Sequence, residues 1–180
     1  MRILGIIFMS LSLTGGGFLL AEYKRERLKM LVQLRQMIHY LKSQILYSNA
    51  TLPEAVDEVG IQFENQENDR EQGWRPSSFF QDVSQLLEEQ GNRPFSEVWR
   101  LAAERIPPGV SLTKRDRENL RSLGGKLGYT DRNMQERTLL FYLEQLDETT
   151  SNVKEEVEIV GKLYRTLGVA AGVFWFVLFI

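Results

Sequence analysis

The chain is apolar at both ends and polar in between, and this layout limits what it can fold into. Residues 3–21 and residues 167–180 contain no charged side chain. As helices they would be roughly 28 Å and roughly 21 Å long, against about 30 Å for the hydrocarbon core of a bilayer. We therefore expect an N-terminal transmembrane anchor over residues 1–21, a domain over residues 22–166, and a C-terminal transmembrane segment over residues 167–180. The last segment is short for a full span, and a buried C-terminal core helix is the competing interpretation.

Basic residues flank both apolar segments on the side of the domain. They are Lys24, Arg25, Arg27 and Lys29 after the first segment, and Lys162 and Arg165 before the second. Short basic flanks tend to remain in the cytoplasm, so the domain over residues 22–166 is predicted to be cytoplasmic. The alternative is a signal peptide cleaved near Gly17, which would make the chain an exported and processed helical binding module.

The composition excludes several kinds of site. The region between the apolar segments carries 21 of the 22 basic residues and all 24 acidic ones, a net charge of −3, which does not suit a nucleic-acid-binding face. The lack of cysteine excludes disulfides, thiolate metal sites and cysteine nucleophiles. His39 is the single histidine, so a multi-histidine metal site is excluded as well. We expect no cofactor, no metal and no nucleic acid.

Apolar residues recur at helical spacing along the domain. A first seam is formed by Leu31, Leu34, Ile38, Leu41 and Ile45. It predicts a helix that continues directly from the N-terminal apolar segment. Thr51 and Glu54 have the spacing of a capping box and predict a short helix that ends near Gly60. Residues 64–73 have nothing to bury, so we expect an exposed loop there.

Three further helices are predicted before a long final one. Pro76 opens the first, Phe95 opens the second, and Thr113 caps the third, which Gly128 closes. The last helix begins at about residue 131. Its seam of coiled-coil type is formed by Leu139, Leu143, Leu146, Thr150, Val153, Val157, Val160, Tyr164 and Leu167. No segment shows sustained period-2 alternation, so we predict an all-α fold: a bundle of about six helices whose terminal helices pack antiparallel and run into the membrane.

No motif for catalysis stands out. The run Gly124-Gly125-Lys126 lacks the first glycine and the Ser or Thr of a phosphate-binding loop, so we expect its glycines to let another helix approach closely. The acidic clusters at residues 88–89 and 155–158 are interpreted as solvated helix faces. A hydrolase that uses these carboxylates is the competing hypothesis. We predict that the chain is not an enzyme.

Several short blocks follow one another in a distinctive order. They are Gln33-Leu34-Arg35, Leu46-Tyr47 leading into Thr51-Leu52, Glu97-Val98-Trp99, Leu123-Gly124 with Leu127-Gly128 and Asp131-Arg132, then Gln135, and finally Leu167-Gly168. Over nearly its whole length the chain thereby resembles the stage III sporulation protein AB family of endospore-forming bacteria. The block from Leu123 to Arg132 is the most distinctive, because it combines a glycine-ended helix, a short turn and a long helix.

The resemblance implies a helical bundle similar to the F-type inner-membrane platform domain of type II secretion systems. It also implies a subunit of a secretion-like channel between mother cell and forespore, placed in the mother-cell membrane and coupled to a cytoplasmic hexameric ATPase, the AA component. Other channel subunits and further copies of the chain are expected partners, and no catalytic residue is implied. Asp131 and Gln135, at the start of the long helix, are candidate partner contacts, with a helix cap and its neighbour as the alternative.

Overall fold

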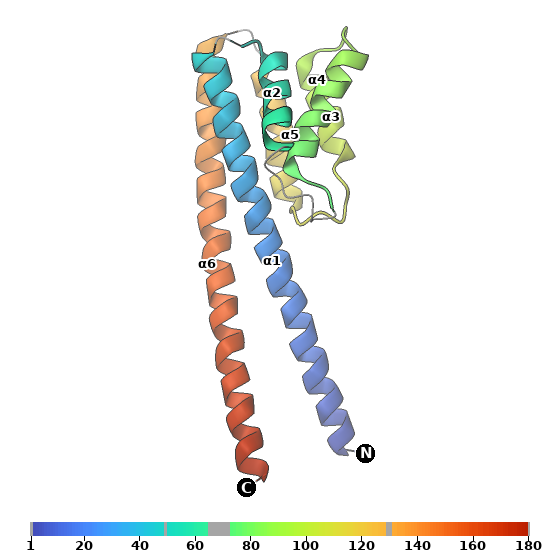
Figure 1. Ribbon diagram of the computed structural model, residues 1–180, viewed down its shortest axis with the longest axis vertical. Coiled ribbons are helices and arrows are strands. Elements are labelled where there is room, and N and C mark those ends of the chain that lie inside the picture. The colour runs from blue at the N-terminus through green and yellow to red at the C-terminus, as the bar shows by residue number, and fades with distance from the viewer. Residues whose placement is uncertain (1, 49, 65–72, 129–130, 180) are drawn as a thin grey trace. The chain divides into compact units, whose positions relative to one another are not determined.

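The computed structural model describes the backbone of residues 2–48, 50–64, 73–128 and 131–179, and the side chains of residues 21–48, 50–64, 73–128 and 131–163. This part of the chain forms six helices and no strand (Figure 1). They are α1 Arg2–Tyr47, α2 Leu52–Glu64, α3 Pro76–Glu89, α4 Phe95–Arg105, α5 Lys114–Leu127 and α6 Arg132–Phe179. The predicted all-α class is confirmed.

The chain divides into two compact units, and both α1 and α6 pass through each of them. The terminal unit consists of Met1–Lys29 and Thr149–Ile180, and the bundle unit is Met30–Glu148. The bundle unit therefore contains the ends of α1 and α6 that are far from the termini, together with α2 to α5.

Within the bundle unit, α1 and α6 pack antiparallel, as the two seams predicted. The guanidinium of Arg132 donates to the carbonyl of Ile45 at 2.7 Å, and the guanidinium of Arg35 pairs with the carboxylate of Asp147. Toward the end of α1 its partner on α6 is near the start of that helix, and earlier along α1 the partner lies further along α6, as in an antiparallel pair. The first seam is buried over its full length, and the α6 seam residues Leu139, Leu143 and Leu146 are buried as well.

Trp99 is the centre of packing among the short helices. Helix α2 packs on α3, α3 on α4, and α4 on α5. The Trp99 ring on α4 meets Phe79 and Phe80 of α3 edge-on, with ring centroids 4.8 Å and 5.9 Å apart. On its other side the indole Nε1 donates to the carbonyl of Leu120 in α5 at 2.7 Å. The indole therefore buries its area and satisfies its one polar group at the same time.

Gly124 lets α5 approach Trp99 closely. A Cβ at Gly124 would overlap the Trp99 ring, whereas a Cβ at Gly125 would meet nothing within 4 Å. The expectation that these glycines allow close approach of another helix is confirmed for Gly124. The neighbouring glycine faces outward and has no such role.

Two predicted helix starts are confirmed by their hydrogen bonds. The carboxylate of Glu54 accepts the backbone N–H of Thr51 at 2.8 Å, directly before α2. At α5 the hydroxyl of Thr113 accepts the N–H of Asp116, and the carboxylate of Asp116 accepts the N–H of Thr113, so the box is complete in both directions. Each bond satisfies a donor that the first turn of a helix leaves unpaired.

The prediction that Gly60 ends α2 is wrong. The helix continues to Glu64, and Gly60 is buried within it. A Cβ at Gly60 would lie 3.4 Å from the side chain of Gln81 on α3, so the glycine marks a close helix–helix contact. Of the loop expected at residues 64–73, Glu64 belongs to the helix, whereas Gly73 is exposed and lies outside any helix. Residues 65–72 lie outside the described part of the chain.

The terminal unit contains the ends of α1 and α6 that carry the predicted anchors. Lys24 Nζ lies 3.0 Å from a carboxylate oxygen of Glu156, so the two helices meet here. Among the residues that the structure describes in full, no helix is both long and apolar enough to cross a bilayer. Apart from Ala21, the predicted anchors over residues 1–21 and 167–180 lie outside those residues.

The Gly124–Trp99 contact predicts opposite effects at two adjacent glycines. Gly124→Ala should lower the free energy of unfolding by about 2–3 kcal/mol, because the new methyl group must displace a packed indole ring. Gly125→Ala should raise it by up to about 1 kcal/mol, because the site is open and alanine favours the helix. Urea unfolding of the full chain in mild detergent, followed by circular dichroism, measures both. Equal effects of the two substitutions would contradict the packing argument.

Candidate functional site

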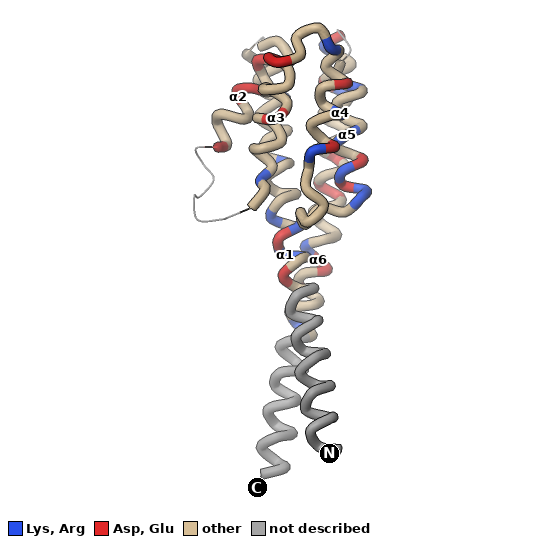
Figure 2. The backbone as a smooth tube through the Cα atoms, turned by 90° about the vertical axis from the view of Figure 1, so that its right-hand side faces the viewer, with Lys and Arg blue, Asp and Glu red and all other residues tan. Residues whose placement is uncertain are grey.

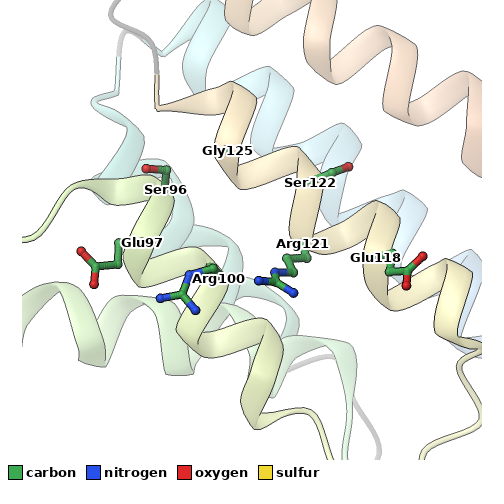
Figure 3. Close-up of a pocket in the computed structure, with 7 residues that line it drawn as sticks. All are labelled: Ser96, Glu97, Arg100, Glu118, Arg121, Ser122 and Gly125. Atoms are coloured by element: carbon green, nitrogen blue, oxygen red, sulfur yellow. The ribbon is translucent and has the colours of Figure 1, made fainter.

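An open groove of about 460 Å³ runs between α4 and α5 (Figure 3). Ser96, Glu97 and Arg100 line it from α4, and Glu118, Arg121, Ser122 and Gly125 line it from α5. The two helices are held at this spacing by Trp99, which lies between them and bonds to Leu120. The groove is thus a surface feature of two packed helices.

Three of the four charged residues that line the groove, Glu97, Arg100 and Arg121, are paired with charged residues beside it. Glu104 accepts from Arg100 at 2.9 Å and lies 3.4 Å from a nitrogen of Arg121. At one end, Arg93 donates to Glu97 at 3.0 Å. An incoming anion would have to compete with Glu104 for both arginines. The groove therefore suits recognition of a polar surface better than capture of a small anion.

The pKa shifts among the described side chains do not mark this groove as a catalytic site. Burial lowers the pKa of His39 on α1, with Arg35 and Lys42 adding to the effect. Burial raises the pKa of Asp82 on α3 and that of Tyr142 on α6. None of these three residues lines the groove. Within the described residues, no group of three or more His, Cys, Asp or Glu side chains could hold a metal ion.

The acidic clusters are placed on exposed helix surfaces. Glu88 and Glu89 are exposed near the end of α3, where Glu89 accepts from Gln85 at 2.8 Å. Residues 155, 156 and 158 are exposed on α6, and Glu156 pairs with Lys24. They behave as solvated helix faces, and neither cluster lines the groove.

The basic residues predicted to flank the membrane belong to the terminal unit, where the described parts of both helices carry Lys or Arg together with Glu (Figure 2). Lys24 is half-buried beside Glu156, and Arg25 lies 3.8 Å from Glu22 on the exposed side of α1. The other described members are Arg27, which is half-buried, and Lys29 and Lys162, which are exposed. The side chain of Arg165 lies outside the described residues.

Comparison with known proteins identifies the family. The sequence model of the family described as stage III sporulation protein AB matches residues 2–180. This chain belongs to that family. A stage III sporulation protein AB from Bacillus subtilis (strain 168) is 24% identical over 172 residues, which is 96% of this chain and 95% of the relative. A solved structure of stage III sporulation protein AB has the same fold, with a TM-score of 0.62 and 22% identity, over 74% of this chain and 97% of that one.

The most distinctive block of the family resemblance forms the junction between α5 and α6. Asp131 accepts the N–H of Asn133 at 3.2 Å and caps the start of α6. Gln135 donates from its side chain to the carbonyl of Leu127 at 3.1 Å and so closes the end of α5. Both candidate contact residues of this family member therefore have a structural role. Asp131 is exposed in addition, so its charge remains available to a partner.

Two arginines one turn apart on α5 should differ strongly in their contribution to stability. The guanidinium of Arg117 donates to the carbonyls of Ile106, Pro107 and Val110, at 3.0, 2.8 and 3.3 Å. Arg117→Ala should cost about 2–3 kcal/mol, because three carbonyls, two of them in partly buried bonds, lose a charged donor. Arg121→Ala should cost less than about 1 kcal/mol, because its ion pair in the groove is exposed. Urea unfolding compares the two, and a larger cost at Arg121 would show that the groove is a structural centre.

Proposed function

We propose that this chain is a non-enzymatic platform subunit of a secretion-like channel between mother cell and forespore. In this proposal residues 1–21 and 167–180 anchor it in the mother-cell membrane, and the bundle unit lies in the cytoplasm, where it couples the channel to a hexameric ATPase. The observation that carries the proposal is the pair of apolar segments, each continuous with a helix of the bundle and each flanked by basic residues on the domain side.

The two long helices support this proposal. α1 and α6 contain 46 and 48 residues without a break, so each continues from an apolar segment into the bundle. Within the bundle unit they are joined by a buried apolar seam, by the Arg35–Asp147 pair and by the bond from Arg132 to Ile45. A force applied to the bundle by a motor would therefore reach the membrane through hydrogen-bonded helix, without any flexible linker.

The proposal assigns the chain a docking role. The groove between α4 and α5 offers paired charges, and the α5–α6 junction offers the exposed carboxylate of Asp131. Polar and charged surfaces of this kind give specificity and orientation to an encounter between proteins. The ATPase would meet the bundle at these surfaces.

The alternative is an exported module released by cleavage near Gly17. It makes a distinct prediction, because the mature protein would then lack residues 1–17 and would leave the membrane. Mass spectrometry of the membrane-bound protein separates the two: an intact N-terminus supports the anchor, and a chain that begins near residue 18 supports export.

The basic flank predicts the topology of the anchored protein. Gly109→Cys places a single thiol on an exposed loop of a chain that has no other cysteine, and a Cβ there meets nothing within 4 Å. In intact cells a membrane-impermeant maleimide should leave this thiol unlabelled until lysis. Adding Arg25→Ala and Arg27→Ala should make part of the population reactive from outside, because fewer positive charges hold the domain in the cytoplasm.

The matched control removes the same charge from the bundle unit, through Lys114→Ala and Arg115→Ala, two exposed positions on α5. It should leave the thiol protected. Labelling of the parent Gly109→Cys protein in intact cells would overturn the cytoplasmic placement. Full protection of the Arg25→Ala, Arg27→Ala variant would overturn the charge argument.

Asp131 allows a test of partner contact that separates charge from folding. Asp131→Asn removes the charge but keeps an oxygen that can cap α6, whereas Asp131→Ala removes both. If Asp131 contacts the ATPase, both variants should lose co-purification with it, and the free energy of unfolding should fall, by about 1 kcal/mol, only in the alanine variant. Normal co-purification of Asp131→Asn would show that this residue is a helix cap alone.

A further inference from the structure

The bundle unit carries opposite charge on opposite sides. α2 and α3 together contain seven acidic residues and no Lys or Arg, whereas α5 contains five basic residues and two acidic ones. In Figure 2, α2 and α3 lie on one side of the unit and α4 and α5 on the other. The overall charge of the chain is only −2, so this separation is a property of the fold and is invisible in the composition.

The outer surface of α2 combines one large apolar side chain with three carboxylates. Ile61 is 51% exposed. Glu54, Asp57 and Glu58 are exposed at positions seven, four and three residues earlier, so they share its face of the helix. Two of them are held in place, Glu54 by the N–H of Thr51 and Glu58 by the hydroxyl of Tyr40 at 3.4 Å. We refer to Glu54, Asp57, Glu58 and Ile61 as the acidic face.

A second surface, where α5 ends and α6 begins, combines apolar side chains with basic ones. Met134, Leu140 and Phe141 are 49%, 46% and 53% exposed on α6. Arg137 is exposed among them, and Lys126 of α5 lies with its Nζ 5.6 Å from the centroid of the Phe141 ring. These five residues form the basic face. The cation over the ring keeps a positive charge beside the most exposed apolar group of this face.

The two faces are complementary to each other. Each combines exposed apolar side chains with charges, as protein interfaces usually do. The acidic face carries three carboxylates, and the basic face carries Lys126 and Arg137 beside the exposed carboxylate of Glu144, so their net charges have opposite sign. We propose that the acidic face of one copy of this chain binds the basic face of a second copy, head to tail. The two faces lie on different surfaces of one unit, so each copy can bind two neighbours, and the contact is heterologous.

Several features favour a second copy over another partner. The chain itself supplies both surfaces: Ile61 is exposed beside carboxylates on one, and Met134, Leu140 and Phe141 are exposed beside cations on the other. On the acidic face, carboxylates that a basic partner would bind lie around Ile61. On the basic face, cations that an acidic partner would bind lie around Phe141. The inference goes beyond the proposed function, because it requires neither the ATPase nor a particular topology.

Paired cysteines in the full chain test the contact. Two differently tagged copies are produced together in cells, one with Ile61→Cys and the other with Phe141→Cys, and their membranes are oxidised. We expect a disulfide between the two tags, because these side chains would meet at the centre of the interface. The matched control replaces Ile61→Cys by Gly109→Cys, an exposed position on neither face, and should give no such product.

Charge reversal tests the complementarity. Asp57→Lys and Glu58→Lys in the Ile61→Cys copy should reduce the cross-linked product about tenfold or more, because like charges would then face each other across the interface. Adding Lys126→Glu and Arg137→Glu to the Phe141→Cys copy should restore it. Restoration also excludes misfolding as the cause of the loss.

Three results would overturn the proposal. They are no disulfide between the two tags, a disulfide only between copies that carry the same substitution, and a disulfide to a different protein in place of the second copy. A cross-link that charge reversal leaves unchanged would also contradict it. Asp131→Asn should leave the cross-link intact, so loss of ATPase binding and loss of self-association can be told apart.

Discussion

Trp99 holds α3, α4 and α5 together, and the packing of these three helices depends on this one side chain. Helices α2 to α5 have 11 to 14 residues each, a length at which an isolated helix is marginal in water. Their stability must come from packing. Trp99 contacts two phenylalanines of α3, lies against Gly124 of α5, and donates its indole N–H to Leu120. The position and spacing of α4 and α5, and with them the groove, follow from this contact.

Side-chain hydrogen bonds close the ends of the helices. The last carbonyls of a helix have no partner within it, and here side chains from elsewhere in the chain supply the donors. Arg132 donates to a carbonyl at the end of α1, and Gln135 donates to one at the end of α5. Arg117 donates to carbonyls of the chain that follows α4. Two of these donors are cations, which the negative end of a helix dipole favours. The first turns of α5 and α6 thereby fix the connections of the bundle, and Asp131 caps the same turn of α6.

The sequence predicts what is local and misses what requires a second helix. The seams of α1 and α6, the caps at Thr51 and Thr113 and the continuity of the long helices follow from spacing alone. Because glycine disfavours helices, the sequence predicts a helix end at Gly60, but a close contact with Gln81 decides its role. Asp116 could have been found from the Thr-x-x-Asp spacing at Thr113. The hydrogen bonds of Arg117 could not have been found from the sequence, because its carbonyl partners reach it only when the loop after α4 folds back.

If the chain is anchored in a membrane and also binds a second copy head to tail, the membrane limits the shape of the assembly. A heterologous contact between free molecules builds a ring if the rotation from one copy to the next closes, and an open helical filament if it does not. Copies that are each anchored in one membrane by two helices cannot rise out of its plane. Head-to-tail contacts among them can therefore extend only within that plane, as rows or as closed rings. Anchoring would then convert a weak, salt-sensitive contact into a defined assembly, because confinement to a surface raises the effective concentration of the two faces for each other.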